Sequence, residues 1–395
     1  MNTTVDELSR PTLGKSLQTF FTLPQARAVG LVFASESLLL GSWVAHIPYV
    51  KAKLGLTDAQ LGLALFGLPA GLILMNPMTG WIIGRIGAAR ACFLSALALC
   101  FSALFPINAP NMVVLAAGLF FIGLSSALLN VAMNTCATDV EREHGISIMS
   151  SCHGMWSLGG MIGSLIAGVM IAFHLPPPVH ILGMIASILT LTLAMRPILA
   201  AIPPQAHSGS QTAFVRPNLM LFLMILIGLA LAMGEGVALD WSAVYLRESA
   251  GATSQIAALG FGSFSLAMTL GRFMGDTIIP RYGARRLLGL GSLVAASGLL
   301  LAVALPSPIP VLTGFVLLGA GSSLGAPILY AASMRIPGIP PATGLATFAS
   351  FSFVGFLAGP PVIGFVAEAY GMAYGLGLVA LLLILTAVLT LKVKL

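Results

Sequence analysis

A few titratable side chains lie within long apolar stretches of this sequence. The acids are Glu36, Glu235 and Asp240, and the bases are His153 and Arg272. An ionisable group in a bilayer core costs at least about 2.5–3.5 kcal/mol on insertion scales. We therefore expect each of these groups to face an aqueous cavity, to pair with another group, or to be neutral.

Glu235 lies between two glycines, Gly234 and Gly236, where the backbone can approach a ligand closely. A low-dielectric environment favours the neutral carboxyl group, so Glu235 is a candidate to load and release a proton as a cavity alternates between two sides. The alternative interpretation is a structural pair with a basic or amide partner.

Glu36 lies about nine residues into the first apolar stretch, which places it about 14 Å along a helix and close to the midplane. Trp43, seven residues later, shares its face. One interpretation is a protonatable carboxyl group beside an aromatic platform, and the other is a locally bonded acid that faces another helix. His46, near the outer end of the same stretch, is interpreted as an interfacial histidine.

Asp240 follows Glu235 by five residues, which is about 140° around an α-helix, so the two acids are expected to point in different directions. Together with Trp241 it could bind a ligand at the outer mouth. We prefer the interpretation that Asp240 caps the end of its helix.

Two further pairs have helical spacing. Asn130 and Asn134 share one helix face, and His153 and Trp156 share another. Amides and imidazole suit hydroxyl-rich ligands, and an indole stacks on a sugar; the alternative is interhelical hydrogen bonding worth about 0.6 kcal/mol. The substrate-binding candidates are Trp43, Asn130, Asn134, His153, Trp156, Glu235 and Trp241. The proton-coupling candidates are Glu235, Glu36, Asp240 and His153.

The elements that position these residues are long apolar helices. Only 8% of the 395 residues are charged, 58% are hydrophobic, and the mean hydropathy is +1.01. About 20 apolar residues cross a hydrocarbon core as a helix. The hydropathy pattern predicts an all-α membrane protein with twelve transmembrane helices near 27–50, 58–83, 89–107, 111–138, 147–172, 178–200, 218–246, 254–280, 285–305, 308–333, 341–367 and 371–391.

A polar segment rich in proline and serine, 201–217, divides the chain into six helices plus six. The expected organisation is an N-terminal cytoplasmic segment 1–26, a six-helix bundle 27–200, a cytoplasmic linker 201–217, a second bundle 218–391 and a cytoplasmic tail 392–395. With both termini in the cytoplasm, 14 of the 18 Lys and Arg residues lie on the inner side. This bias explains the net charge of +6 without a nucleic-acid partner.

An internal repeat supports the division. Residues 78–90 align with residues 274–286 with seven of thirteen positions identical, and each copy follows the second helix of its half. Parallel repeats of this kind build one large class of transporters.

The first copy reads Gly80-x-x-x-Gly84-Arg85-x-Gly87-x-x-Arg90 and resembles the G-x-x-x-D-R-x-G-R-R loop of the major facilitator superfamily. Gly84 replaces the usual Asp, so an altered charge latch is expected. The residues assigned to a cytoplasmic gate are Gly80, Arg85, Gly87, Arg90, Arg272, Asp276, Arg281 and Gly283. Arg272 is included because Asp276 lies one turn away, and the alternative for Arg272 is a ligand clamp.

The chain also resembles the fucose-permease-like branch and the YbjJ-type bacterial permeases. The resemblance is carried by Ser42-Trp43, His153-Gly154-x-x-Ser157-Leu158-Gly159, Glu235-Gly236, Asp240-Trp241, Gly271-Arg272-Phe273 and Gly359-Pro360-Pro361. It implies two pseudo-symmetric six-helix bundles that rock around a midplane site in the bacterial inner membrane.

What this resemblance implies is a proton-coupled permease for a sugar-like or polyol-like solute. Such relatives can have an acid near Asn130, so its absence here places proton coupling on Glu235 or Glu36. The alternatives are efflux of drugs or metabolites and, more remotely, a non-transporting membrane receptor.

Other functional classes find little support in the sequence. It has no Ser-His-Asp, H-E-x-x-H or Rossmann pattern in a plausible context, so we expect no enzyme activity. Gly14-Lys15-Ser16 lacks the first glycine of a P-loop, which argues against ATP binding. The four cysteines lack metal-ligand spacing, so we expect no metal. The expected partners are a solute and the bilayer, the driving force is a proton gradient without a cofactor, and the chain is expected to be monomeric.

Overall fold

The computed structural model describes residues 13–203 and 215–393, except for the side chains of residues 13–17, Asp276 and Ala342. Within these ranges the regular elements are all helical. Twelve of the helical segments are long and apolar enough to cross a membrane. The all-α prediction with twelve spans is therefore confirmed, while most of the predicted linker lies outside the described residues.

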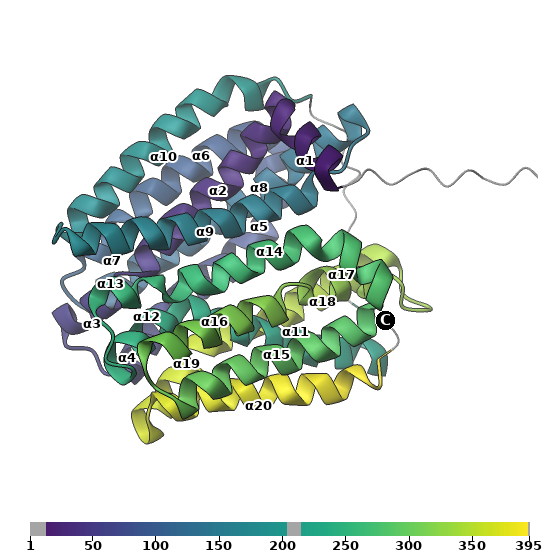
Figure 1. Cartoon of the computed structure of the whole chain (residues 1–395). Helices are drawn as coiled ribbons and strands as arrows, with labels where there is room; N and C mark the ends of the chain where they lie inside the picture. Colours follow the sequence, from purple (N-terminus) through teal and green to yellow (C-terminus); the bar gives the residue numbers. More distant parts are fainter. Residues whose placement is uncertain (1–12, 204–214, 394–395) are drawn as a thin grey trace, which may run out of the picture.

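The first half of the chain forms one bundle, drawn from purple to teal in Figure 1. Its helices are α1 (Leu13–Thr22), α2 (Pro24–Val44), α3 (Ile47–Leu54), α4 (Asp58–Leu65), α5 (Gly67–Ile86), α6 (Ala88–Ser102), α7 (Leu104–Asn108), α8 (Met112–His144), α9 (Met149–Ala172) and α10 (Pro177–Ala200).

The second half forms the other bundle, drawn from green to yellow. Its helices are α11 (Leu219–Gly236), the π-helical η1 (Val237–Trp241), α12 (Ser242–Val244), the π-helical η2 (Tyr245–Ser249), α13 (Ser254–Ala257), α14 (Leu259–Tyr282), α15 (Ala284–Ala304), α16 (Pro308–Ser322), α17 (Gly325–Ser333), α18 (Pro341–Ser352), α19 (Val354–Tyr370) and α20 (Met372–Thr390).

Proline explains two departures from the predicted boundaries. The first span ends at Val44 rather than near 50, and Pro48 lies in the first turn of the separate helix α3. The tenth span is interrupted between α16 and α17, where Pro327 lacks the N–H that would bond the carbonyl of Ser323.

The two copies of the internal repeat have the same backbone conformation. Gly87 joins α5 to α6 with φ +83° and ψ 152°, and Gly283 joins α14 to α15 with φ +83° and ψ 137°. These are positive-φ conformations that glycine adopts readily and other residues rarely do. The repeat that the sequence predicts is therefore also a structural repeat.

Glycines bring the helix axes close together. A Cβ atom built on Gly159 would lie 2.2 Å from the Ala34 carbonyl oxygen, and one on Gly163 would lie 2.2 Å from the Leu38 carbonyl oxygen. These two positions join α9 to α2 over two turns. Small residues thus permit close contact between these two helices.

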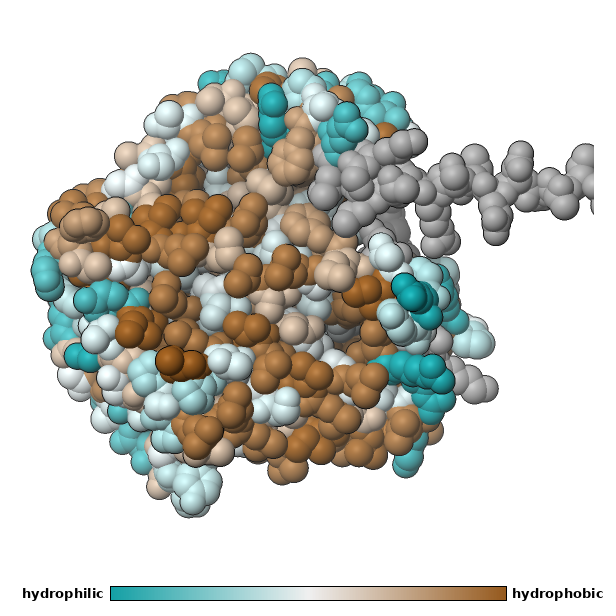
Figure 2. Space-filling model, in the orientation of Figure 1, coloured by the Kyte–Doolittle hydropathy of each residue, from teal (hydrophilic) through white to brown (hydrophobic). Residues whose placement is uncertain are grey.

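The outer surface of the bundles is apolar. Large hydrophobic side chains project outward, among them Val113, Leu219 and Ile309, each more than 70% exposed. Figure 2 shows hydrophobic residues across the middle of this face and hydrophilic ones towards the ends of the helices. This surface and the twelve apolar helices define a multi-pass membrane protein.

Candidate functional site

A cavity of about 390 Å³ lies between the two bundles. The first half contributes Met149, Ser150 and His153 from the start of α9. The second half contributes residues of α11, α14, α17 and α18, with Phe353 and Phe356 at the start of the eleventh span's second helix. Both halves thus line one cavity.

Three polar side chains meet in this cavity: Glu235 from α11, Arg272 from α14 and His153 from α9. The Arg272 guanidinium interacts electrostatically with both Glu235 and His153. Its Nη1 donates a hydrogen bond to the Ser157 hydroxyl at 3.0 Å, which links α14 to α9 across the two bundles.

Arg272 lacks a close counter-ion among the described residues. The ion pairs within 4.0 Å in the described ranges join Lys51 to Asp58, Lys51 to Glu248 and His144 to Glu143. Arg272 belongs to none of them, and only one of its five N–H donors has a described partner.

Apolar and aromatic side chains form most of the cavity wall. Tyr330 and Phe348 make an edge-to-face contact with ring centroids 5.7 Å apart, and Phe353 and Phe356 lie 5.6 Å apart. Within this wall the Ser352 hydroxyl is buried and has no hydrogen-bond partner among the described residues.

Glu36 lies elsewhere, inside the first bundle. It is 4% exposed, and its carboxyl group faces the Ser126 hydroxyl of α8 and the Trp156 indole of α9. Glu36 Oε2 and Ser126 Oγ complete no hydrogen bond with described atoms. Trp43 is buried in the core of the same bundle, so neither Glu36 nor Trp43 lines the cavity.

Asp240 lies within a helix rather than at its end. The seventh span continues through η1, α12 and η2 to Ser249, so the helix-cap interpretation is wrong. The 140° angle to Glu235 also assumed α-helical geometry, whereas Asp240 lies in the wider π-helical turn η1. Trp241 is fully buried beside it and is a core residue outside the cavity wall.

The two asparagines of α8 are joined by a hydrogen bond that Asn134 donates. Asn134 Nδ2 donates to the Asn130 carbonyl oxygen at 2.8 Å. Asn130 is exposed and Asn134 is half-buried, but neither belongs to the cavity wall. Of the seven predicted substrate-binding residues, the cavity includes His153 and Glu235.

The gate-motif residues are mostly at the helix ends. Arg85 stacks on Trp81 with the guanidinium 4.4 Å from the ring centroid, and Arg281 lies 5.4 Å from the Tyr282 ring. A Cβ on Gly80 would meet open space, and Arg90 is exposed. The Asp276 side chain lies outside the described part.

Arg272, assigned to the same gate by the sequence, also lines the cavity. Its role in a gate stays a prediction.

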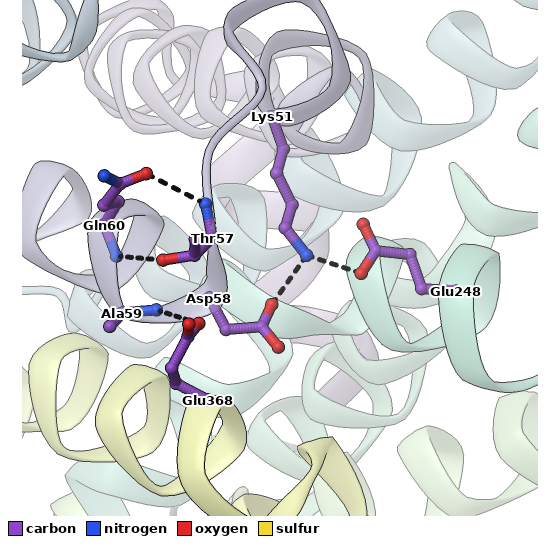
Figure 3. A network of polar contacts seen from close by, with 7 residues as sticks. All are labelled: Lys51, Thr57, Asp58, Ala59, Gln60, Glu248 and Glu368. Carbon is purple, nitrogen blue, oxygen red and sulfur yellow. Dashed lines mark hydrogen bonds and ion pairs between the residues drawn. The ribbon is translucent and has the colours of Figure 1, made fainter.

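The other end of the molecule is closed by a group of three charged residues, which we call the outer triad: Lys51, Asp58 and Glu248 (Figure 3). Lys51 Nζ lies 2.6 Å from Asp58 Oδ1 and 2.5 Å from Glu248 Oε2. Burial lowers the pKa of Lys51, but its hydrogen bonds to the two carboxylates and their charges outweigh burial and hold the pKa above its usual value. Asp58 belongs to the first half and Glu248 to the second, so Lys51 ties the bundles together.

Backbone packing continues this closure. A Cβ on Gly62 would lie 2.5 Å from the Pro360 carbonyl oxygen, and one on Gly364 would lie 2.6 Å from the Asp58 carbonyl oxygen. The Ala59 N–H also donates to Glu368 Oε2 at 3.4 Å, as Figure 3 shows. Helices α4 and α19 therefore pack closely beside the outer triad.

His46 is also buried near this end, so its interpretation as an interfacial residue is wrong. Its Nε2 lies 2.8 Å from Nδ1 of His180. Sequence reasoning missed both this pair and the outer triad. Lys51 and Glu248 have opposite charges, but they are 197 positions apart, so their spacing in the sequence does not predict that they pair.

Within the described ranges, His, Cys, Asp and Glu do not gather in groups of three or more that could hold a metal ion. The polar groups of the cavity are instead suited to binding a small charged or hydrogen-bonding molecule.

Comparison with known proteins agrees with this architecture. The family model described as Major Facilitator Superfamily matches residues 28–335. The chain therefore belongs to the Major Facilitator Superfamily, a family of membrane transporters.

An uncharacterized MFS-type transporter of Yersinia pestis is 32% identical over 365 residues, covering 92% of this chain and 94% of the relative. An uncharacterized transporter of Sinorhizobium fredii is 33% identical over 367 residues, covering 92% and 96%.

Two solved structures share the fold at low sequence identity. A point mutant of the nucleoside transporter NupG superposes with a TM-score of 0.72 at 13% identity and covers 94% of this chain and 99% of its own. A point mutant of the Escherichia coli fucose:proton symporter FucP superposes with a TM-score of 0.60 at 17% identity and covers 95% and 100%.

Proposed function

We propose that this protein is a proton-coupled secondary transporter that moves a small polar solute by alternating access through the cavity between its bundles. We place it in the bacterial inner membrane with both termini in the cytoplasm, on the basis of the positive-inside bias. In that orientation the outer triad closes the external side and the cavity belongs to an inward-facing state.

The observation that carries the proposal is the position of Glu235. Among the cavity-lining residues that the structure describes, it is the one carboxylate. An ionised carboxylate against an apolar wall is costly without a partner, whereas a neutral one is tolerated. A cavity that opens in turn to each side would let Glu235 take up a proton on one side and release it on the other.

The choice of solute class rests on the structural neighbours and on the size of the cavity. The neighbours are a nucleoside transporter and a fucose:proton symporter, both of which act on hydroxylated molecules. The cavity volume suits a molecule of this size. A sugar-like or polyol-like solute is accordingly our starting class.

The test is proton-driven accumulation in vesicles. Purified protein in proteoliposomes is screened with fucose, myo-inositol and uridine. The outside is kept more acidic than the inside, so that the proton gradient drives uptake. Glu235→Gln is expected to abolish accumulation while leaving solute counterflow, because counterflow needs no net proton movement. The control is Glu143→Gln, a partly exposed residue outside the cavity. Equal accumulation by the Glu235 and Glu143 variants rejects the proposal.

The apolar wall favours a second candidate function, efflux of apolar drugs or metabolites. An overexpressing strain would then grow better than its parent on toxic apolar compounds. Unchanged growth across such a panel would remove this candidate.

A further inference from the structure

We propose that Arg272 binds the negative charge of the solute, and that the solute is an organic monocarboxylate with an apolar body. This inference rests on the proposed transport function and replaces the neutral sugar-like or polyol-like starting class with a charged one. Glu235 and the solute carboxylate are then alternative partners of the same guanidinium.

The first step is the state of Arg272. It is the one Lys or Arg side chain among the described cavity residues, it is half-buried, and its described hydrogen bond uses a single N–H donor. A guanidinium at this depth requires compensation. Ser157 is neutral and does not balance this charge, and the planar fork of a guanidinium suits a bidentate carboxylate.

The second step is the relation between Arg272 and Glu235. The two interact electrostatically but do not form an ion pair within 4.0 Å among the described contacts. A permanent structural pair would be in direct contact. In the proposed loaded state an anion pairs with Arg272 while Glu235 carries a proton.

On α14 itself, Asp276 lies one turn from Arg272, and its side chain is outside the described part. Arg272 on α14 and Tyr330 on α17 face Glu235, and His153 on α9 faces Arg272. Helices α16 and α18 contribute no titratable residue in the described part, and α19 and α20 contribute Glu368, Tyr370 and Tyr374, which lie towards the end that carries the outer triad.

The third step is charge and shape. One guanidinium matches one negative charge, and a phosphate dianion would need further cations that the described wall lacks. Leu231, Phe348 and Phe356 suit an apolar or aromatic body.

This arrangement gives a simple account of coupling. In the empty carrier, ionised Glu235 and Arg272 balance each other. In the loaded carrier, Glu235 holds a proton and the solute carboxylate balances Arg272. Both states keep the cavity neutral, whereas a carrier loaded with the proton or the anion alone would carry a net charge across an apolar barrier. One proton therefore travels with each anion.

The test uses matched acid and neutral probes. The thermal stability of the purified full chain in detergent is measured with phenylacetate and phenylacetamide, and with gluconate and sorbitol. The expected result is stabilisation by phenylacetate but not by phenylacetamide, and a weaker effect of gluconate. Protonation of Glu235 releases Arg272, so phenylacetate binding to the wild type strengthens as the pH falls, and this pH dependence disappears in Glu235→Gln.

Variants separate charge recognition from folding. Arg272→Gln is expected to weaken phenylacetate binding at least tenfold and Arg272→Lys to restore part of it. Arg281→Gln, at the end of the same helix, retains wild-type binding. The proposal is overturned by equal stabilisation from the amide, by retained binding in a folded Arg272→Gln, or by no stabilisation from either acid.

The readout also separates the inference from the proposed function. Anion binding without accumulation in vesicles would leave the anion site in place and reject proton-coupled transport. Accumulation of a neutral solute without anion binding would support proton-coupled transport and reject the anion site.

Discussion

Substitution of Lys51 by methionine should open the end of the molecule that the outer triad closes. The change preserves much of the aliphatic stem and removes the charge that bridges Asp58 and Glu248. The Lys51 and Asp58 side chains are 10% and 20% exposed, but Glu248 is 44% exposed, so solvent screens the second contact. Between the 0.2–1 kcal/mol of an exposed pair and the 3–5 kcal/mol of a broken buried one, we expect a loss of about 1–2 kcal/mol.

That loss corresponds to a shift of about 5–30-fold in the ratio of open to closed molecules at this end. Spin labels at Ala52→Cys and Ser254→Cys report it, since both positions are exposed and lie in opposite halves near the outer triad. The native cysteines are buried and should label poorly. Double electron–electron resonance in the Lys51→Met background should show a new, longer distance population.

Lys53→Met is the matched control. Lys53 lies on the same short helix, and its described contact is a 3.4 Å hydrogen bond to a backbone carbonyl, with no carboxylate partner in the described ranges. Its distance distribution should remain that of the labelled parent. If Lys51→Met and Lys53→Met give the same distribution, the outer triad does not hold the two bundles together.

Three further changes test the packing and the charges. Gly163→Val should lower stability by about 1–3 kcal/mol, because the new side chain would clash with the Leu38 carbonyl oxygen. The control is Gly183→Ala, whose new Cβ meets open space and should leave the thermal unfolding temperature unchanged. Gly87→Ala should cost about 1–2 kcal/mol at its φ of +83°, and a result equal to that of Gly84→Ala would show that this backbone conformation is not required. The raised pKa of Lys51 means that the outer triad contributes its full stabilisation below the usual lysine pKa and loses it only as the pH rises through the higher folded-state value. The label distances should therefore hold steady from pH 7 to 9, and opening within that window would contradict this assignment.

The helices of this protein could be predicted closely because each membrane-spanning helix requires about 20 consecutive apolar residues, which are visible directly in the sequence. Apolar runs, glycines and prolines placed most span boundaries within a few residues of the structure. The exceptions are the first span, whose early end at Val44 depends on Pro48, and the fourth span, which continues to His144 beyond the predicted end at 138. The repeat around Gly87 and Gly283 was visible because both turns require the same positive φ.

The site was only partly predictable because depth and pairing are properties of the folded chain. Glu235 and His153 were identified from their types within apolar helices, and both line the cavity. Arg272 is assigned to the gate because Asp276 follows it by one helical turn, but this spacing does not show that Arg272 also lines the cavity. The π-helical turn at Asp240 changes the face that a residue presents, and hydropathy carries no signal for it.

The central claim is that water reaches the cavity from one side of the membrane at a time. Tyr330→Cys tests it directly, because Tyr330 lines the cavity and is 44% exposed. A membrane-impermeant methanethiosulfonate cation should label this cysteine from the cytoplasmic side of sealed vesicles, and the additional change Lys51→Met should increase labelling from the opposite side. Labelling from neither side, or an unchanged pattern when Lys51 is replaced, would contradict the account.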